Sequence, residues 1–451
     1  MKKIFNIKHT IILLLFIILA VRFSLVVNTL WLLFYFIILL FTDPALARGQ
    51  FSFDLLDCFF SVLSALTVIV VLIISEFGSN PLKKKLTYLE NRISFTSFAV
   101  IILLICYILA PMVADTNPEF QKNINVTRLL PPFSEVTEII STRNSEKINN
   151  DQFLIMKGKV VKNSFNNNIL FADSVKNGTQ IIYYQKGSAH ILQTEETADS
   201  RPYDLGQTPR GLDNKDLLRG GGVKITSKMF LLGTDEFGRD IFSRLIYGAR
   251  VSLTVGLLSV LITFILGSLL GFFAGYSGGF VDSFLNRLSD MFLSFPVIFL
   301  IILILALFGN SILSVIIILG FSGWMSLFKI VRSEIIRLKR RDYFLTAKLM
   351  GTGNLRLIFL EMLPVIAAPV MVNLVFQFGN VILAEAALSY LGLGTGGSIP
   401  SWGSMIEAGQ GYIYRAWWMI VFPGLTLFLS LFIINNLGNR IKIVLNPWQR
   451  K

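Results

Sequence analysis

Long apolar runs, separated by charged or glycine-containing stretches, dominate the pattern of hydrophobic and polar positions along this chain. Several runs hold about 18 or more apolar residues, enough for a helix to cross about 30 Å of hydrocarbon. In the second half of the chain they predict spans at about 251–276, 293–309, 311–331, 364–390 and 418–438. The pattern therefore predicts an all-α polytopic membrane protein.

The N-terminal segment 1–82 adds about two membrane elements, the apolar runs 10–41 and 56–76. The first run is about 48 Å long as a helix, too long for one upright span. It is interrupted by Arg22, which we expect at an interface because a charge in mid-bilayer is costly. Our preferred interpretation is one span, about 23–42, preceded by an apolar helix on the cytoplasmic side; a hairpin is the alternative.

Residues 115–230 differ in character, because they are polar, rich in Asn, Lys and Gly, and contain no run long enough to span a membrane. The segments FLIMKGKVV, NILFADSV, TQIIYYQKG and AHILQT have the composition of short strands, and the turn signals NSFNNN and KNGT lie between them. We expect a small β-rich domain within 136–228. After a span at 94–114, the number of crossings places it outside the membrane.

Charge is scarce and unevenly placed, with 15% of the 451 residues charged and a net charge of +13. Basic residues cluster beside apolar runs, which is typical of cytoplasmic loops and does not indicate nucleic-acid binding. This pattern predicts about eight spans with both termini in the cytoplasm. The loop residues concerned are Arg287, Arg332, Arg337, Lys339, Arg340, Arg341, Lys348, Arg440, Lys442, Arg450 and Lys451.

The chain lacks the motifs of the commonest catalytic and metal sites. It has no GxxxxGK[ST] segment to cradle ATP phosphates, and no HExxH or CxxC pair. Its two cysteines, Cys58 and Cys106, lie inside apolar runs, which excludes a disulfide framework. Its two histidines, His9 and His190, are far apart in the sequence. No catalytic residue, metal site or bound cofactor is predicted, and the chain is not expected to be an enzyme.

The segment DYFLTAKLMGTGNLRLIFLEMLP, residues 342–364, is unusually elaborate for a loop between spans. Its glycines Gly351 and Gly353 permit a sharp turn, and Pro364 suits the first turn of the next helix. A helix that projects, turns and returns could insert into a groove on another protein. The alternative is a helix lying on the lipid surface. The residues of the projecting helix are Tyr343, Phe344, Leu345, Thr346, Ala347, Lys348, Met350 and Gly351.

This segment resembles the EAA loop of bacterial ABC import permeases, in which a short coupling helix is seated in a cleft of the ATPase. The segment Leu345-Thr346-Ala347 occupies the EAA position, Gly351 matches the glycine, and Leu363-Pro364 matches the end of the pattern. Leu345 stands where the family has Glu. We therefore expect docking to rely on apolar packing of Phe344, Ala347 and Met350 rather than on a carboxylate.

A second stretch, MFLLGTDEFGRDIFSRLIYGARVSLTVGL at 229–257, resembles the signature of the dipeptide/oligopeptide/nickel permease family in its C-type subunit. Its first residues read as a turn and a helix cap, followed by an amphipathic helix whose arginines are available at the membrane surface. We favour this structural role over direct substrate contact. The signature residues are Gly233, Thr234, Asp235, Gly238, Arg239, Asp240, Arg244 and Arg250.

A third stretch, AEAALSYLGLGTGGSIPSWGSMIEAGQGY at 384–412, is similar to the same subunit. Glu385 is the one ionisable residue of the span 364–390, and it either lines a water-filled path or makes a hydrogen bond inside the bundle. Gln377 and Asn380 of that span are further pathway candidates. Asparagines near the end of the last span are expected to hydrogen-bond between helices; they are Asn435, Asn436 and Asn439.

The resemblance covers 94–135 and 229–451, and it implies a type I ABC-importer core of six helices. The expected organisation has two parts outside the core, namely extra N-terminal membrane segments at 1–82 and an external region at 115–230 that holds the β-rich insertion 136–228. The core itself consists of a first span within 83–114 and five further spans within 231–451, with the cytoplasmic coupling loop at 332–363.

The resemblance also implies the setting, namely a multi-pass permease subunit of the bacterial cytoplasmic (inner) membrane. The implied partners are a second permease subunit in a heterodimer, one or two ATPase subunits that bind ATP and Mg, a substrate-binding protein, and the lipid bilayer. Peptides are the implied substrate, with nickel chelates or other small solutes as alternatives. Two other classes remain open, a non-transporting envelope scaffold and a proton-coupled transporter, although the latter favours several intramembrane carboxylates and internal repeats.

Overall fold

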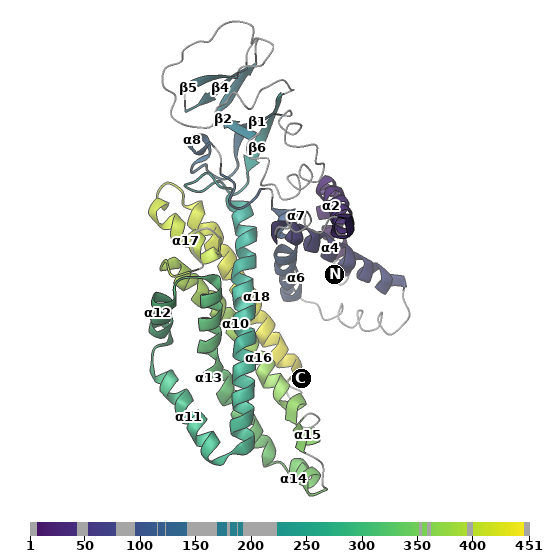
Figure 1. Ribbon diagram of the computed structural model, residues 1–451, viewed down its shortest axis with the longest axis vertical. Coiled ribbons are helices and arrows are strands. Elements are labelled where there is room, and N and C mark those ends of the chain that lie inside the picture. The colour runs from purple at the N-terminus through teal and green to yellow at the C-terminus, as the bar shows by residue number, and fades with distance from the viewer. Residues whose placement is uncertain are drawn as a thin grey trace, which may run out of the picture. The chain divides into compact units, whose positions relative to one another are not determined.

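The computed structural model describes residues 7–42, 53–77, 95–114, 116–121, 123–141, 169–177, 181–186, 188–192, 223–350, 354–358, 362–394 and 400–445 (Figure 1). The chain forms two compact units. The first unit takes Met1–Ile93, Ile105–Tyr247 and Gly411–Phe422. The second unit takes Ser94–Leu104, Gly248–Gln410 and Pro423–Lys451.

The N-terminal part of the first unit is helical. Its helices are α1 (Ile7–Val21), α2 (Phe23–Thr42), α4 (Phe53–Phe77), the end of α6 (Phe95–Ile108) and α7 (Ala110–Val113). Their apolar faces share one core, made of Leu15, Val26, Val62, Ala65, Leu109 and Met112. A polar contact ties α4 to the end of α6, because the Ser61 hydroxyl donates to the Ile108 carbonyl at 2.7 Å.

Arg22 marks the boundary between α1 and α2, which are bent by 80° at this break. Its guanidinium donates to the Ala114 carbonyl at 3.5 Å, after the end of α7. Such a break occurs in a broken span and in a re-entrant loop alike, and the second helix begins at Phe23. Arg22 thus lies at a helix break, where a polar partner is available.

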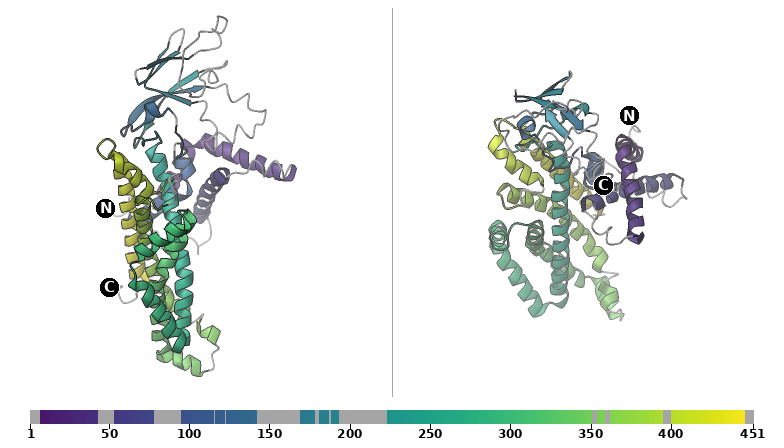
Figure 2. Two further views of the ribbon diagram at one scale, coloured as in Figure 1. Left: turned by 60° about the vertical axis from the view of Figure 1, so that its left-hand side comes forward. Right: turned by 45° about the horizontal axis from the view of Figure 1, so that its top comes forward.

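Two three-stranded antiparallel sheets form the β part of the first unit. One has the order β2-β1-β6, from Ile169–Ala172, Ser134–Ser141 and Val223–Phe230. The other has the order β3-β4-β5, from Ser174–Asn177, Ile181–Gln185 and Ser188–Leu192 (Figure 2). The predicted strands NILFADSV, TQIIYYQKG and AHILQT correspond to β2, β4 and β5. The pattern missed β1 and β6, and it placed a turn where β3 ends. The predicted strand FLIMKGKVV lies outside the described residues.

Strands β1 and β6 form a stem that closes the ends of the inserted segment. Their register runs from Ser134 opposite Phe230 to Ser141 opposite Val223. At the base, the Phe133 amide donates to the Phe230 carbonyl at 2.9 Å. The two ends of the insertion therefore lie next to each other, although they are far apart in the sequence. A short loop could join them equally well, so the insertion does not separate the segments on either side of it.

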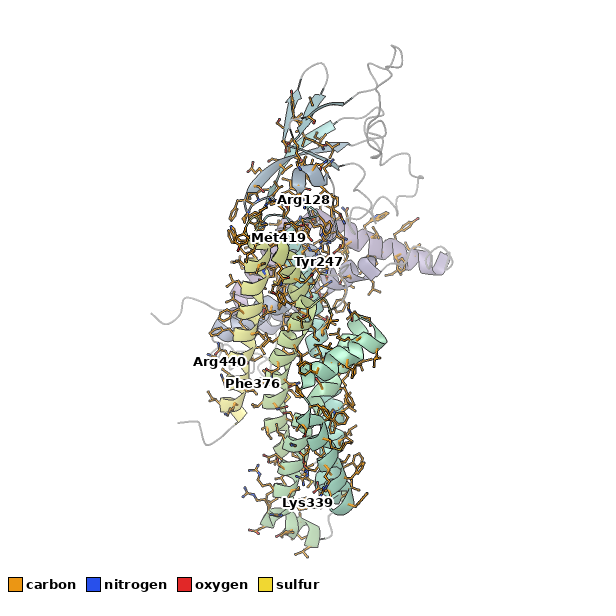
Figure 3. All side chains as sticks on the ribbon, turned by 90° about the vertical axis from the view of Figure 1, so that its left-hand side faces the viewer. Arg128, Tyr247, Lys339, Phe376, Met419 and Arg440 are labelled. Atoms are coloured by element: carbon orange, nitrogen blue, oxygen red, sulfur yellow. The ribbon has the colours of Figure 1, made fainter. Side chains whose placement is uncertain are left out.

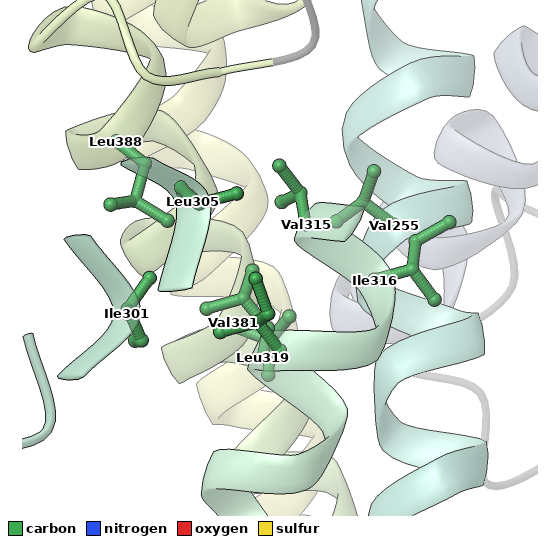
Figure 4. Close-up of a cluster of buried hydrophobic side chains, with 9 residues drawn as sticks. Val255, Ile301, Leu305, Val315, Ile316, Leu319, Val381 and Leu388 are labelled. Carbon is green, nitrogen blue, oxygen red and sulfur yellow. The ribbon is translucent and has the colours of Figure 1, made fainter. Parts of the chain in front are cut away.

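The second unit is a helical bundle. It contains most of α10 (Ile241–Ser277), α11 (Gly279–Ser294), α12 (Val297–Phe308), α13 (Ile312–Lys339), α14 (Asp342–Leu349), α15 (Asn354–Leu357), α16 (Leu363–Tyr390), α17 (Trp402–Gly409) and most of α18 (Trp418–Leu445). Its buried core includes Val255 of α10, Leu305 of α12, Leu319 of α13 and Val381 of α16 (Figure 4).

Four described helices are long and apolar enough to cross a membrane, namely Ile241–Ser277, Ile312–Lys339, Leu363–Tyr390 and Trp418–Ile443. A fifth results if α1 and α2 form one broken span. The predicted span 293–309 does not meet this test, because the chain breaks at Phe295 and Pro296 and leaves α12 with 12 residues. The described residues thus contain fewer full-length spans than the eight expected from hydropathy.

Small residues let α10 and α13 approach closely. A Cβ atom on Gly271 of α10 would lie 2.8 Å from the Phe328 carbonyl oxygen, and one on Gly320 of α13 would lie 2.9 Å from the Ser259 carbonyl oxygen. Hydroxyls reinforce this seam, because Ser259 donates to the Ile316 carbonyl at 3.0 Å and Thr263 donates to the Gly320 carbonyl at 2.8 Å. The two helices are held by close backbone packing and interhelical hydrogen bonds.

Substitution of Gly271 by Ala is expected to destabilise the protein, because the new methyl group meets backbone that cannot move alone. The overpacking cost is about 1–3 kcal/mol. Thermal unfolding of the purified protein in detergent measures the effect. Gly424→Ala is the matched control, since a Cβ at that position of α18 meets nothing within 4 Å. Equal melting temperatures for the two variants would contradict the close approach.

Candidate functional sites

The face of α14 that was expected to bind an ATPase packs instead against other helices of this chain. Phe344 is 4% exposed and packs in a cluster with Leu338, Leu357 and Met362, and Ala347 lies against the same cluster. The expectation that Phe344 and Ala347 form the docking face is therefore wrong. Both side chains stabilise the link of α14 to α13, α15 and α16.

The opposite side of α14 carries large apolar side chains that the second unit does not cover. Leu349 is 88% exposed and Met350 is 82% exposed, and Tyr343 and Leu345 are about half as exposed at 45% and 46%. Of the three side chains that were expected to dock, only Met350, which directly follows α14, is exposed; Leu345 and Leu349 are exposed as well. Thr346 is exposed, Gly351 lies outside the described residues, and the side chain of Lys348 is likewise not described.

Ion pairs fix the part of α13 that leads to α14. The Arg332 guanidinium pairs with Asp282 of α11 through two nitrogens, and Lys329 pairs with Asp290 of the same helix at 2.7 Å. Lys339 donates to the Tyr276 carbonyl at 2.7 Å and lies near α14, as Figure 3 shows. Lys329, Arg332 and Lys339 of α13 therefore hold α10, α11 and α13 together.

The signature segment 233–240 folds into a tight loop around the Asp235 carboxylate. One carboxylate oxygen accepts from the amides of Phe237 and Arg239, both at 2.9 Å, and the other accepts from Arg239 Nε at 2.7 Å. Gly238 has φ +75°, and a Cβ there would lie 2.0 Å from Thr127 Oγ1. Both the backbone conformation and the available space therefore require glycine.

Two arginines of the signature are buried, contrary to the expectation that they are available at a membrane surface. Arg239 and Arg244 are 6% and 4% exposed, and each contacts one Glu119 oxygen at 3.1 Å. Arg244 also lies 3.7 Å from the Asp235 carboxylate. The buried guanidiniums thus join the loop at 119 to the signature. Arg250 is half-buried.

Further hydrogen bonds of Thr234 and Asp240 complete this cluster. The Thr234 hydroxyl accepts from the Leu130 amide at 2.8 Å and donates to the Thr127 carbonyl, while the Thr234 carbonyl accepts from Trp418 Nε1 at 3.1 Å. Asp240 caps α10 by accepting from the Ser243 amide at 3.0 Å. Sequence reasoning missed Glu119, Thr127 and Trp418, because nothing in their local sequence indicates partners more than a hundred residues away.

Glu236 is the exception in this well-paired cluster. Its Oε2 atom is buried and has no hydrogen-bond partner, and its Oε1 atom lies 4.0 Å from Arg239. Burial raises the pKa of the Glu236 carboxyl, and the charge of Asp235 acts in the same direction, whereas Arg239 and Arg244 oppose both. Most charged groups of the cluster are paired with each other, so its role is to hold the loop together.

Glu385 is fully buried at the end of α16, next to the N-terminus of α17. Its carboxylate accepts from Ser252 of α10 at 3.0 Å and from Ser389 at 2.8 Å. The Trp402 amide donates to the Ser252 hydroxyl at 3.4 Å, which extends the network to α17. Of the two interpretations for Glu385, this geometry supports the hydrogen bond inside the bundle. Gln377 is half-buried and Asn380 is exposed.

The asparagines of α18 do not behave as expected within the described part of the chain. Asn435 and Asn439 are exposed and Asn436 is half-buried. Asn435 Oδ1 lies 3.8 Å from the position that a Cβ on Gly379 of α16 would take. This places it near α16, without the interhelical hydrogen bond that was expected.

Removing the Glu385 carboxylate is expected to destabilise this joint. Glu385→Leu leaves the Ser252 and Ser389 hydroxyls without their acceptor, at a cost of about 1–3 kcal/mol. Glu385→Gln keeps one amide oxygen as an acceptor and should cost less. Melting temperatures in detergent measure both. If both variants melt like the wild type but transport differently, Glu385 acts in the path and not in the joint.

Comparisons with known proteins show which family and which sequences this chain resembles. Residues 267–451 match the family model described as "Binding-protein-dependent transport system inner membrane component". The di/tripeptide transport system permease protein DppC of Pseudomonas aeruginosa UCBPP-PA14 is 39% identical over 248 residues, which cover 54% of this chain and 80% of that protein. The dipeptide transport system permease protein DppC of Escherichia coli K12 is 41% identical over 221 residues, covering 49% of this chain and 74% of that protein.

Among solved structures, the MetNI methionine ABC transporter in inward-facing conformations (CY5 native crystal form) is similar with a TM-score of 0.40 and 15% identity. That match covers 46% of this chain and 98% of that chain. The relatives of known sequence are much more similar, and this chain covers more than two thirds of their length. The chain belongs to the family of binding-protein-dependent transport system inner membrane components.

Proposed function

We propose that this chain is the permease subunit of an ATP-driven importer of peptides, and that it forms half of the translocation path beside a second permease subunit. The observation that carries the substrate class is the identity of 39–41% to permeases named for dipeptides and di/tripeptides. The observation that carries the coupling role is α14, a short anchored helix with an uncovered apolar face.

The proposed partners on the cytoplasmic side are one or two ATPase subunits. Leu345, Leu349 and Met350 would insert into a cleft of such a subunit, since large apolar side chains exposed to water favour a partner of similar chemistry. No carboxylate is needed for this contact, which accommodates Leu345 in place of the family Glu. The chain contributes the moving surface, and its partners bind ATP and Mg.

The packing of Phe344 suggests how motion of α14 would reach the membrane. Its cluster includes Val331 and Ile335 of α13 and Ile366 and Val370 of α16. A displacement of α14 would therefore act on two long helices together, because a close-packed core transmits a shift instead of absorbing it. ATP-dependent closure can favour one of two bundle arrangements only if the ATPase contacts differ between them.

The domain organisation that we propose keeps a transport core in 83–114 and 231–451, with 1–82 and the β-rich insertion 136–228 as additions. In this proposal the insertion lies outside the membrane and contacts the substrate-binding protein. The β1–β6 stem supports its role as a separate module, because the stem brings the two ends of the insertion together.

Leu349→Asp is expected to uncouple ATP hydrolysis from uptake, because a charge on the exposed face of α14 opposes insertion into an apolar cleft. We expect at least a tenfold fall in peptide uptake by the reconstituted complex with a melting temperature unchanged. Leu391→Asp is the control, since Leu391 is 56% exposed and follows the other end of α16. Normal coupled uptake by Leu349→Asp would refute the docking role.

Replacing residues 142–222 by an Asn-Gly turn tests the insertion, because such a turn suits an antiparallel hairpin between β1 and β6. The deletion also removes Phe171 from its buried cluster with Phe120 and Phe230, so the melting temperature of the shortened chain is measured first; basal ATPase activity in the complex should be kept. Uptake should require a higher concentration of binding protein, by about tenfold. The comparison is a titration of binding protein against uptake rate, and an unchanged titration would count against the contact.

A further inference from the structure

Helix α16 carries three amide side chains on one face. Asn373, Gln377 and Asn380 are spaced i, i+4 and i+7, which places them along a single stripe of the helix. We call this set the amide stripe. In the part of the chain that the structure describes, their amides form no hydrogen bonds, and Asn373 Oδ1 is buried without a partner. Phe376, which Figure 3 labels, belongs to the same stretch of α16.

Unpaired amides are costly in a helix that crosses hydrocarbon, where no water can satisfy them. Such groups therefore face either a water-filled path or a polar partner. The stripe itself is uncharged, because its three side chains are amides, and the one carboxylate of α16, Glu385, is hydrogen-bonded to Ser252 and Ser389. A surface of this kind offers donors and acceptors together but no net charge.

The geometry points to the main chain of a peptide in transit as the ligand of the amide stripe; this inference rests on the proposed function. Side-chain amides match the donor and acceptor of a peptide group. From Asn373 to Asn380 the helix rises about 10 Å, at 1.5 Å per residue. About three residues of an extended peptide cover the same length, at about 3.3 Å each. Main-chain recognition without charge would accept peptides of different side chains.

Gly323 of α13 makes room for the middle of the stripe. A Cβ atom at Gly323 would lie 2.5 Å from Gln377 Nε2 and equally close to Thr263 Oγ1. Gly323 thus allows the Gln377 amide to lie beside the α10–α13 seam, half-buried and still unbonded. Asn380, by contrast, is exposed on the second unit, so the stripe runs from a covered to an open position.

The test compares a tripeptide with its analogue N-methylated at the central amide, which lacks one donor. Uptake rates are measured with the reconstituted transporter at saturating binding protein for both compounds. The wild type should favour the unmodified tripeptide. In Gln377→Leu and Asn380→Leu we expect this preference to fall by roughly three- to tenfold, the effect of losing one hydrogen bond. Leu383→Ala, on an exposed part of α16 outside the stripe, should keep the wild-type ratio.

Each outcome has one meaning. An unchanged ratio in both stripe variants, with peptide uptake intact, overturns the inference and leaves the proposed function standing. Loss of the second permease subunit from the purified complex in these variants also overturns it, because the stripe would then be a helix–helix contact. If the wild-type transporter moves no peptide but moves another solute, the proposed function itself is wrong.

Discussion

The close approach of α10 and α13 is the constraint on which the second unit depends. In a membrane, apolar surfaces gain little by leaving lipid for each other, so helices associate through close packing and interhelical hydrogen bonds. Gly271 and Gly320 allow the two backbones to meet, and the hydroxyls of Ser259 and Thr263 bond across the seam. Figures 1 and 2 show α10 and α13 running alongside each other. The core of Figure 4 and the room beside Gly323 both follow from this approach.

The first unit depends on a different constraint, because its signature loop buries the charged side chains of Asp235, Arg239 and Arg244. Isolated buried charges are expensive, and they persist only when they are paired and hydrogen-bonded. Here Asp235 and Glu119 hold Arg239 and Arg244, and the glycine at 238 lets the loop pass against Thr127. The β1–β6 stem protects this arrangement, since it admits a long insertion without separating the segments on either side.

Transport, as we propose it, uses two surfaces of the second unit with opposite chemistry. The outer face of α14 is apolar and suits a protein partner, whereas the amide stripe of α16 is polar and suits a substrate. Both helices contribute to the cluster around Phe344 and Val370. A partner that moves α14 therefore acts on the helix that carries the stripe, which is a direct mechanical link between the two proposed sites.

The sequence by itself determined the membrane class, the long helices and the place of the motifs, because hydropathy, glycines and caps act over a few neighbouring residues. It also predicted β2, β4 and β5 from local composition. Only the tertiary structure decided which side chains are covered. It turned Phe344 inward and Leu349 outward, buried Arg239 with Glu119, and placed Glu385 among serines from other helices. The physical reason is that burial and pairing depend on partners far away along the chain, which no local pattern encodes.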